Sequence, residues 1–442
     1  MNSGPSFLSA SILAHPKSEV IQRILSAAIQ AVEPGNAIAN FVQRRGALLT
    51  VDDVDYDLDA YRHVYVLAIG KASQAMTKAL VRILGDYLTC GWVIPKHAYH
   101  ETDPRLTVQP GGHPLPDENS LAAGNLLVQA SQSFSVEDLV FCLVSGGGSA
   151  LVTAPYPGIT LQDMQDLTRE LLACGARIDE INTLRRHLDQ VKGGGLAKLA
   201  APAQIVSLIL SDVVGSPLEA IASGPTVADP SSVQDALDVI DRYHLGGSIP
   251  AVIQHHLIAG SETPKPGDKL FERVQNVLVG SNELAARAAA RQAYLDGIEP
   301  VLLGSEWQGE ARFVAVQIIA ELTENTNSPV CLIAGGETTV TLHGKGKGGR
   351  NQELALAAVP VLNGKKDVLL VTLATDGEDG PTDAAGAVVT GETMARGLVL
   401  GLDVYEYLSE NDAYHYFEAL GDLIKPGPTG TNVNDLTFLF KH

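Results

Sequence analysis

The stretch 139-LVFCLVSGGGS-149 decides the fold class, because an apolar run here is followed directly by a glycine-rich turn. Leu139 to Val144 is short and uninterrupted, which is typical of a buried strand in a sheet covered on both faces. No ordinary strand continues through Ser145-Gly146-Gly147-Gly148-Ser149. The pattern indicates a strand and turn of an α/β protein.

Two more apolar runs end in the same way. His63 to Ile69 leads into Gly70-Lys71, after which apolar residues recur at helical spacing as far as Gly85. Ile205 to Leu210 ends at Ser211-Asp212. The carboxyl ends of parallel strands share one edge of a sheet, where ligands bind. We therefore expect the three turns, with Lys71 and Asp212, to lie at one such edge.

The rest of the chain repeats the alternation of strands and helices. A helix is expected from Val20 to Val32, and a capping box at Thr160 and Asp163 predicts the start of another. In the second half, strands are expected at 276–279, 300–303, 330–334 and 368–374, and helices at 283–295, 311–322 and 351–361. We predict an α/β protein of two doubly wound, Rossmann-like, three-layer domains, at residues 1–235 and 236–442. The boundary follows the irregular segment Ala222 to Pro230.

Composition narrows the class of function. The 442 residues are 45% hydrophobic and only 5% aromatic, and their formal net charge of −20 opposes binding to nucleic acid or to an anionic membrane. No apolar stretch approaches the roughly 18 residues of a membrane span. The four cysteines show no CxxC spacing and indicate thiols in a reducing compartment. We expect a cytoplasmic enzyme with a small-molecule substrate, no nucleic-acid partner and no membrane partner, and a homodimer is the assembly considered.

The glycine-rich turn after Val144 is a candidate phosphate site. Gly146, Gly147, Gly148 and Ser149 offer successive backbone N–H groups without side chains that would obstruct an anion. A tight turn that needs its glycines only for steric reasons is the alternative. A serine-hydrolase elbow is a weaker one, because the closing glycine of GxSxG is missing.

A second glycine loop, Gly344-Lys345-Gly346-Lys347-Gly348-Gly349-Arg350, gathers three cations in an otherwise acidic chain. Lys345 and Lys347, with the backbone of Gly348 and Gly349, are candidates for binding the phosphates of ATP. The loop also satisfies GxGxxG, so a dinucleotide site is the alternative. The three cations favour a triphosphate. No Walker GxxxxGK[ST] occurs, which excludes an ordinary P-loop kinase.

Carboxylates follow the expected strand at 368–374. Asp376, Asp379 and Asp383 lie within one loop, and Glu337 completes the candidate ligands for a hydrated Mg²⁺ shared with phosphate groups. A solvated acidic turn is an equal alternative, because the spacing fails the EF-hand pattern.

The remaining candidates are ambiguous by position alone. On position alone, a surface lysine is the better interpretation of Lys71, whereas Asp212 suits a helix cap as well as a catalytic base or metal ligand. Arg185 and Lys192 belong to a basic cluster suited to a carboxylate, which a solvated helix face explains nearly as well. His113, in a proline-rich turn, is interpreted as structural.

Taken together, the motifs resemble the glycerate 2-kinase family over nearly the whole chain. The matching blocks are AIGKA (68–72), GGHPLPDENS (111–120), VSGGGSAL (144–151), NTLRRHLDQVKGG (182–194), SDVVGSPLEAIASGPT (211–226), GKGKGGRNQE (344–353), ATDGEDGPTDAAGA (374–387) and GPTGTNVNDL (427–436). Residues of about 328–438 resemble the MOFRL module of that family. The departures are Ser216-Pro217, where an acidic residue often follows the glycine, and Pro426; they leave the metal-binding details open.

The resemblance implies ATP- and Mg²⁺-dependent phosphorylation of D-glycerate at its 2-hydroxyl, giving 2-phosphoglycerate and ADP in a cleft between the two domains. It implies catalytic roles for Lys71 and Arg350 and makes Asp212 a candidate base or metal ligand. Arg185, Lys192 and Asn434 become candidates for substrate binding.

Two alternatives remain. Members of the family have been labelled hydroxypyruvate reductases, so an NAD(P)H-dependent reductase is one, supported here only by the GxGxxG match. A non-catalytic protein that binds a sugar acid or nucleotide is the other. Lys71, Arg350, Asp212 and the acidic loop together argue against it.

Overall fold

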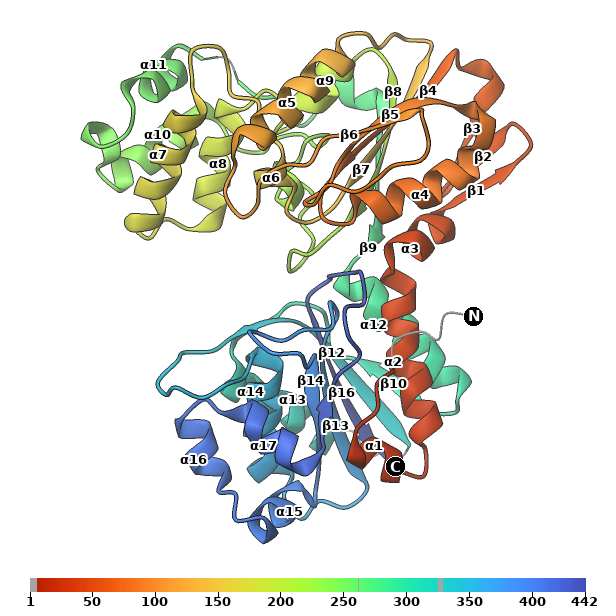
Figure 1. Cartoon of the computed structure of the whole chain (residues 1–442), viewed down its shortest axis with the longest axis vertical. Coiled ribbons are helices and arrows are strands. Elements are labelled where there is room, and N and C mark those ends of the chain that lie inside the picture. Colours follow the sequence, from red (N-terminus) through yellow and green to blue (C-terminus); the bar gives the residue numbers. More distant parts are fainter. Residues whose placement is uncertain (1–5, 261, 325–328) are drawn as a thin grey trace. The chain divides into compact units, whose positions relative to one another are not determined.

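The computed structural model describes residues 6–260, 262–324 and 329–442, which form two compact units (Figure 1). The middle unit consists of Pro34–Ser211 and Ser216–Val279. The terminal unit combines the N-terminal segment through Glu33, the short piece Asp212–Gly215, and Gly280–His442.

The middle unit contains a six-stranded sheet in the order β6-β5-β4-β7-β8-β9. Neighbours from β6 to β8 are parallel, as in a doubly wound sheet. A separate antiparallel meander holds β1, β2 and β3. The strands are β1 Val42–Arg45, β2 Leu48–Val51, β3 Val54–Asp57, β4 His63–Ile69, β5 Leu88–Ile94, β6 Leu106–Val108, β7 Asp138–Val144, β8 Gln204–Leu210 and β9 Val274–Gly280.

Helices cover both faces of this sheet, with α4 on one side and α5 and α9 on the other (Figure 1). A separate bundle of α7, α8, α10 and α11 has an apolar core that includes Leu171, Leu184 and Ile253. The α-helices are α3 Pro34–Phe41, α4 Ser73–Leu84, α5 Glu118–Ser131, α6 Gly148–Leu151, α7 Leu161–Ala173, α8 Ile178–Leu188, α9 Gly195–Ala200, α10 Val233–Arg242 and α11 Ala251–Ala259. Short 3₁₀ helices are η1 Leu58–Ala60, η2 Gly85–Tyr87, η3 Ile221–Ser223, η4 Leu245–Gly247 and η5 Lys269–Arg273.

The terminal unit contains a mixed sheet in the order β10-β12-β16-β13-β14-β15, with β11 also paired to β12. β10 and β11 run parallel to β12, whereas β16 lies antiparallel between β12 and β13. β13–β14 and β14–β15 are antiparallel pairs. The strands are β10 Glu299–Leu302, β11 Trp307–Glu310, β12 Val330–Thr339, β13 Val368–Ala374, β14 Gly386–Thr390, β15 Leu423–Ile424 and β16 Asp435–Lys441.

Helices also cover both faces of the mixed sheet: Figure 1 shows α2 and α12 on one side and α13 and α14 on the other. Leu332, Leu370 and Leu439 of the strands pack with Ile318 and Leu354 of the helices in one apolar core. The helices are α1 Ala10–Ala14, α2 Ser18–Val32, α12 Asn282–Leu295, α13 Ala311–Glu324, α14 Arg350–Leu362, α15 Thr393–Val399, α16 Val404–Ser409 and α17 Ala413–Leu420.

Local sequence signals account for many of these elements. The strands expected after His63, Leu139 and Ile205 are β4, β7 and β8. Thr160 and Asp163 form the expected capping box of α7, in which the hydroxyl accepts from the Asp163 N–H and the carboxylate accepts from Thr160. The α/β class with two sheet-containing units is thereby confirmed, and the terminal sheet is mixed because β16 and β14 both pair antiparallel with β13.

The division of the chain differs from the predicted boundary at residue 235. β9 extends the sheet of the middle unit beside β8, so that unit continues to Val279. Helix α2 packs along α12 and belongs to the terminal unit. The predicted start of the MOFRL-like module, residue 328, lies outside the described residues.

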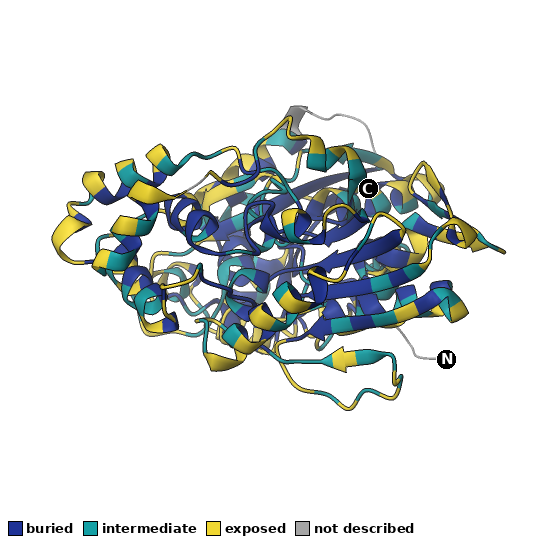
Figure 2. Cartoon of the chain, turned by 90° about the horizontal axis from the view of Figure 1, so that it is seen from above, coloured by how far each residue is buried: buried dark blue, intermediate teal, exposed yellow. Residues whose placement is uncertain are grey.

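The strands of the sheets are more deeply buried than the helices that cover them. In Figure 2 the sheet strands are dark blue along much of their length, whereas many helices show exposed outer turns. Within the described ranges, every helix is too short or too polar to cross a bilayer. All four cysteines are free thiols.

Candidate active site

The three predicted turns of the middle unit lie at one edge of its sheet. β4, β7 and β8 are adjacent and parallel, and Ile69, Val144 and Ile209, at or next to their carboxyl ends, lie opposite one another in register. The turns at Lys71 and at 145–149, and the segment that starts at Ser211, therefore leave the sheet side by side. This confirms the predicted arrangement at the carboxyl edge, where α/β proteins bind ligands.

Hydrogen bonds join the turn at Lys71 to the glycine-rich turn after β7. The Lys71 N–H donates to the Gly146 carbonyl at 2.9 Å, and the Ala72 N–H donates to Ser145 Oγ at 3.1 Å. Gly70 has a φ of +120°, and a Cβ there would lie 2.2 Å from Ser145 Oγ, so only glycine fits. The backbone of Lys71 is thus fixed, while its side chain is exposed.

The Lys71 side chain lies along the glycine loop. A Cβ on Gly147, whose φ is +82°, would lie 3.2 Å from Lys71 Cε and 3.1 Å from His113 Cδ2. His113, interpreted from sequence as structural, is therefore a neighbour of both Lys71 and this loop. Burial lowers the pKa of His113, and the charges of Lys71 and Lys96 lower it further.

The two candidates for carboxylate binding differ in their surroundings. The Lys192 ammonium is buried and donates to the Val152 carbonyl and to Asp189 Oδ2, each at 2.7 Å. Burial lowers the pKa of Lys192, and Asp189 opposes that shift. Arg185 makes no hydrogen bond or ion pair with another described side chain, and burial lowers the pKa of its guanidinium. Arg185 therefore has its donors available for a ligand.

A strained turn connects the glycine loop to the turn after Lys192. Ala222 and Ser223 have φ values of +50° and +61°, which side-chain-bearing residues rarely adopt. Ser223 Oγ lies 2.8 Å from Ser149 Oγ, and the Ser223 carbonyl accepts from the Gly193 N–H at 2.9 Å. One strained turn thus fixes two candidate ligand-binding segments of the middle unit.

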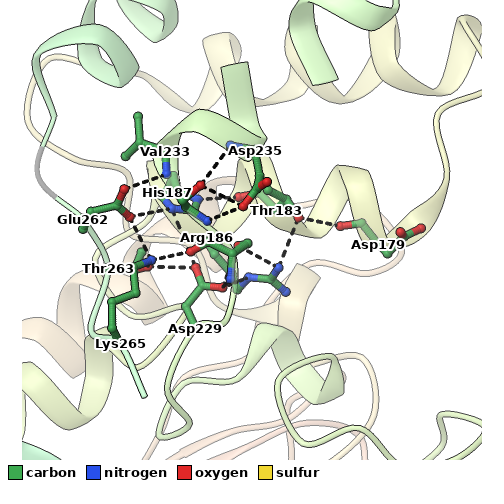
Figure 3. A network of polar contacts seen from close by, with 12 residues as sticks. Asp179, Thr183, Arg186, His187, Asp229, Val233, Asp235, Glu262, Thr263 and Lys265 are labelled. Atoms are coloured by element: carbon green, nitrogen blue, oxygen red, sulfur yellow. Dashed lines mark hydrogen bonds and ion pairs between the residues drawn. The ribbon is translucent and has the colours of Figure 1, made fainter. Parts of the chain in front are cut away.

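A buried polar network holds α8, which carries Arg185, against the segment after Gly224 (Figure 3). Arg186 Nε lies 2.8 Å from Asp229 Oδ1, and both side chains are almost fully buried. The Asp229 carboxylate also accepts from Ser231 and from the Thr263 hydroxyl. Removal of one partner would leave the other polar group buried and incompletely satisfied.

We expect Asp229→Asn to lower the free energy of unfolding by about 1–3 kcal/mol, because the Arg186 guanidinium loses its buried counter-charge. Asp238→Asn is the matched control, since Asp238 is exposed on α10. Urea denaturation measures both. A loss no larger for Asp229 than for Asp238 would contradict the structural role of the network.

In the terminal unit, Arg350 lies between two carboxylates. Its Nη1 donates to Glu337 Oε1 at 2.5 Å, and its Nε donates to Asp435 Oδ2 at 2.6 Å. The sheet explains this arrangement, because Asp435 at the start of β16 lies opposite Gly336 of β12 and Ala374 of β13. The antiparallel strand therefore brings its first residue to the edge where its two neighbours end.

Burial and neighbouring charges shift the pKa values of Arg350 and of the carboxyl groups of Asp435 and Asp376. Burial lowers the pKa of Arg350, but the carboxylates of Asp435 and Glu337 outweigh it and raise the pKa above its ordinary value. Burial raises the pKa of Asp435 to about 6, although Arg350 opposes the shift. Burial also raises the pKa of Asp376.

The four candidate metal ligands are not gathered at one point. Asp379 is buried and caps α14, accepting from the Asn351 N–H at 3.2 Å and the Gln352 N–H at 2.8 Å. Burial raises the pKa of Asp379 to about 7. Asp383 instead accepts from the Tyr414 hydroxyl at 2.7 Å. Among the residues the structure describes, no three His, Cys, Asp or Glu side chains form a group that could hold a metal ion.

The cationic loop borders a cavity of about 430 Å³, lined by Gly346, Gly348, Gly349, Arg350, Thr338 and Glu353 among others. The Lys345 side chain is exposed, and Lys347 Nζ lies 3.8 Å from the centre of the Tyr414 ring. A Cβ on Gly349 would lie 2.3 Å from Asp379 Cγ, so the close approach to this carboxylate requires glycine. A larger cavity of about 850 Å³ lies near the start of β13, at the end of that strand that is opposite to Asp376.

Comparisons with known proteins identify the family of the chain. A family model described as a domain of unknown function (DUF4147) matches residues 20–258, and that of the MOFRL family matches residues 330–435. The glycerate 2-kinase of Pyrococcus horikoshii is 40% identical over 427 residues, covering 95% of this chain and 96% of that protein. The chain belongs to the glycerate kinase family. The resemblance inferred from its motifs is thereby confirmed.

Other members of the glycerate kinase family match over similar lengths. The human glycerate kinase is 38% identical over 488 aligned positions, covering 96% of this chain and 93% of that protein. The crystal structure of a Thermotoga maritima glycerate kinase has a TM-score of 0.85 and 37% identity, covering 96% of this chain and 99% of that chain. A crystal structure of a Pyrococcus horikoshii protein has a TM-score of 0.88, 38% identity, and coverage of 97% and 99%.

Within this glycerate kinase fold, the predicted site residues fall into two sets. The middle unit carries Lys71, Arg185, Lys192 and 146–149, whereas the terminal unit carries Arg350, the cationic loop, the four carboxylates and Asn434. Asp212 begins the short piece that belongs to the terminal unit. Asn434 has a φ of +66°, and its carbonyl accepts from the Thr375 hydroxyl at 2.6 Å. The individual roles of these residues remain predictions.

Sequence reasoning missed Asp435 and the position of His113. Asp435 directly precedes the apolar run Leu436 to Phe440, so a search for carboxylates at strand ends would have found it. The local sequence does not indicate the direction of that strand in the sheet, and the proximity of Asp435 to Arg350 depends on that direction.

Proposed function

We propose that this chain transfers the γ-phosphate of ATP to the 2-hydroxyl of D-glycerate, giving 2-phosphoglycerate and ADP. Membership of the glycerate kinase family supports the reaction class. The observation that carries the proposal is the fixed placement of Lys71 along the glycine loop at the carboxyl edge of a parallel sheet. A cation beside open backbone N–H groups is suited to a phosphoryl group that gains negative charge as it is transferred.

Arg185 and Lys192 are proposed to bind the carboxylate of the acid. Within the part of the chain that the structure describes, the Arg185 guanidinium has no hydrogen-bond or ion-pair partner, so it can offer two parallel N–H groups to a carboxylate. The Lys192 ammonium donates to the Val152 carbonyl and to Asp189, and its third donor is left for a ligand. Asn434 remains a further candidate for substrate binding.

The nucleotide is proposed to bind in the terminal unit. Lys345, Lys347 and Arg350 supply positive charge around the glycine loop and its cavity, which suits a triphosphate better than a dinucleotide. The loop Gly146–Ser149 would bind the oxygens of the group in transfer.

Magnesium is proposed to arrive with the nucleotide. Mg²⁺ is commonly bound through one or two carboxylates plus phosphate oxygens and waters, and the separated carboxylates of this chain fit that mode better than an all-protein site. Asp379 is buried as the cap of α14, and Asp383 accepts from the Tyr414 hydroxyl. Asp376 and Glu337 would hold the cation: each already accepts one hydrogen bond through a single oxygen, from the Glu378 N–H and from Arg350, and keeps its second carboxylate oxygen for a ligand. Bound Mg²⁺ would neutralise charge on the phosphates. Asp212 would act as a base or as a further ligand.

The test is incubation of the purified chain with ATP, Mg²⁺ and D-glycerate, followed by ³¹P NMR of the product. We expect 2-phosphoglycerate. A parallel incubation with NADH and hydroxypyruvate should leave NADH unoxidised. Formation of 3-phosphoglycerate would contradict the assigned position of transfer, whereas hydride transfer without phosphorylation would establish the reductase alternative.

Asp376→Asn should raise the Mg²⁺ concentration needed for half-maximal rate by about tenfold, because an amide binds the cation more weakly than a carboxylate. Glu378→Gln is the control, since Glu378 is exposed in the same loop. Initial rates against Mg²⁺ at saturating ATP provide the measurement. An unchanged Mg²⁺ requirement would show that Asp376 does not bind the cation and belongs to a solvated acidic turn.

The compartment and the assembly are also proposals. Four free thiols support a reducing compartment such as the cytoplasm. The homodimer remains a prediction that light scattering tests.

A further inference from the structure

His113 occupies the same side of the glycine loop as Lys71. The position that a Cβ on Gly147 would take lies 3.3 Å from His113 Nε2 and 3.2 Å from Lys71 Cε. The nitrogen edge of the imidazole and the end of the lysine side chain therefore approach one glycine. Whatever ligand lies against Lys71 and this loop also comes within reach of His113.

The turn that carries His113 is fixed by the surrounding structure. The Gly111 N–H donates to the Pro95 carbonyl at 3.1 Å, and the Gly112 N–H donates to Ser120 Oγ at 2.9 Å. A Cβ on Gly111 would lie 2.0 Å from the Leu151 carbonyl oxygen at the end of α6. The glycine is thus needed for the turn to pack closely beside the helix that follows the glycine loop.

The ring nitrogens of His113 are available, unlike those of several other histidines. His63, His187 and His415 each place Nδ1 within 3 Å of an oxygen of this chain. Among the described residues, neither nitrogen of His113 forms such a contact, and the side chain is half-buried. Burial and the neighbouring cations Lys71 and Lys96 keep the pKa of His113 below its usual value. A neutral imidazole is able to accept a proton.

We infer that His113 is a catalytic base, whose Nε2 accepts the proton of the substrate's 2-hydroxyl as that oxygen attacks the γ-phosphorus. The new bond joins the hydroxyl oxygen to phosphorus, and the bond from phosphorus to the bridging oxygen breaks with its electron pair going to ADP. The proton resides on His113 until solvent takes it. This inference rests on the proposed function. It adds a base to a site where Lys71 supplies positive charge.

The kinetic test uses His113→Gln and His113→Ala, with His255→Gln, an exposed histidine of α11, as the control. We expect both His113 variants to lower kcat by about 10², whereas the control keeps its activity. Added imidazole should restore a large part of the rate to His113→Ala, because the free base can occupy the space that the ring has left. A structural role alone predicts no such rescue. Near-normal kcat in either variant, or folded His113→Ala that imidazole does not rescue, would overturn the inference.

A second measurement separates this inference from the proposed function. Histidine ¹⁵N NMR of the wild-type protein, with the His113 signals assigned by their loss in His113→Gln, reports directly on the ring. Addition of D-glycerate should shift the Nε2 signal of His113 even where no ATP is present. If the wild type does not phosphorylate glycerate and this shift still occurs, the proposed function fails while the contact stands. Absence of the shift at saturating D-glycerate overturns the assignment of His113.

Discussion

Arg350→Ala is expected to lower kcat with glycerate and MgATP by about 10²–10³, because it removes a fixed cation that would stabilise charge on the transferring group. The two carboxylates that hold the guanidinium, Glu337 and Asp435, leave some of its five N–H donors for phosphate oxygens. Arg350 would thus be oriented before the nucleotide binds, which is the condition for a large electrostatic contribution. Steady-state kinetics at saturating substrates provide the measurement.

The same structure changes what we expect for stability. Loss of Arg350 leaves Asp435 and Glu337 without their shared cation, so the fold should also lose stability. The pKa of Asp435 is already raised to about 6 by burial, so this carboxyl can bind a proton near neutral pH and limit the cost. We therefore expect a measurable fall in Tm that is smaller at pH 6 than at pH 8.

Two other variants make the result specific. Arg287→Ala removes an exposed arginine of α12 and should leave kcat unchanged. Arg350→Lys retains the charge but not the planar fork, so it should recover only part of the activity. Near-normal turnover of folded Arg350→Ala would contradict the role and make Arg350 a purely structural bridge between the two carboxylates.

The sequence was sufficient for the carboxyl edge of the middle sheet. Apolar runs that end in polar or glycine-rich turns are local features, and parallel strands bring such turns together without further information. The turns at Lys71 and 145–149 were therefore found correctly. The position of His113 beside Gly147 was not found from the sequence, because it depends on how a distant proline-rich turn packs against α6.

The terminal unit illustrates the opposite case. β16 is apolar and easily recognised as a strand, but its antiparallel insertion between β12 and β13 is a long-range choice that composition does not encode. That choice alone brings Asp435 to Arg350. In the same way, the apolar face of α2 predicted a helix but not that it would pack on α12, which is distant in sequence.

The acidic loop shows that composition does not determine what a carboxylate does. Asp376, Asp379 and Asp383 are close in sequence, yet Asp379 caps α14 and Asp383 accepts from Tyr414. Asp379 caps the N-terminus of α14, which directly follows the glycine loop about thirty residues earlier in the sequence. Gly349 is required there because a Cβ at this position would collide with the Asp379 carboxylate. Only Asp376 remains with neither of these roles.

Lys71→Ala should also lower kcat by about 10²–10³, because the side chain lies along the glycine loop where the transferring group is proposed to bind. Its side chain is exposed and outside any core, so we expect Tm to remain close to that of the wild type, in contrast to Arg350→Ala. Lys78→Ala, an exposed lysine on the following helix α4, is the matched control and should keep its turnover.

The double variant of Lys71 and Arg350 tests whether both cations act on one transition state. Residues that work as a unit give losses that are less than multiplicative, since removal of the first already abolishes much of the effect of the second. We therefore expect the double variant to be slower than either single variant but faster than the product of the two losses predicts. Full multiplicativity would mean that the two cations contribute independently. Near-normal kcat of Lys71→Ala at saturating MgATP and glycerate would instead show that Lys71 is a surface cation, and the proposed function would then lose the observation on which it rests.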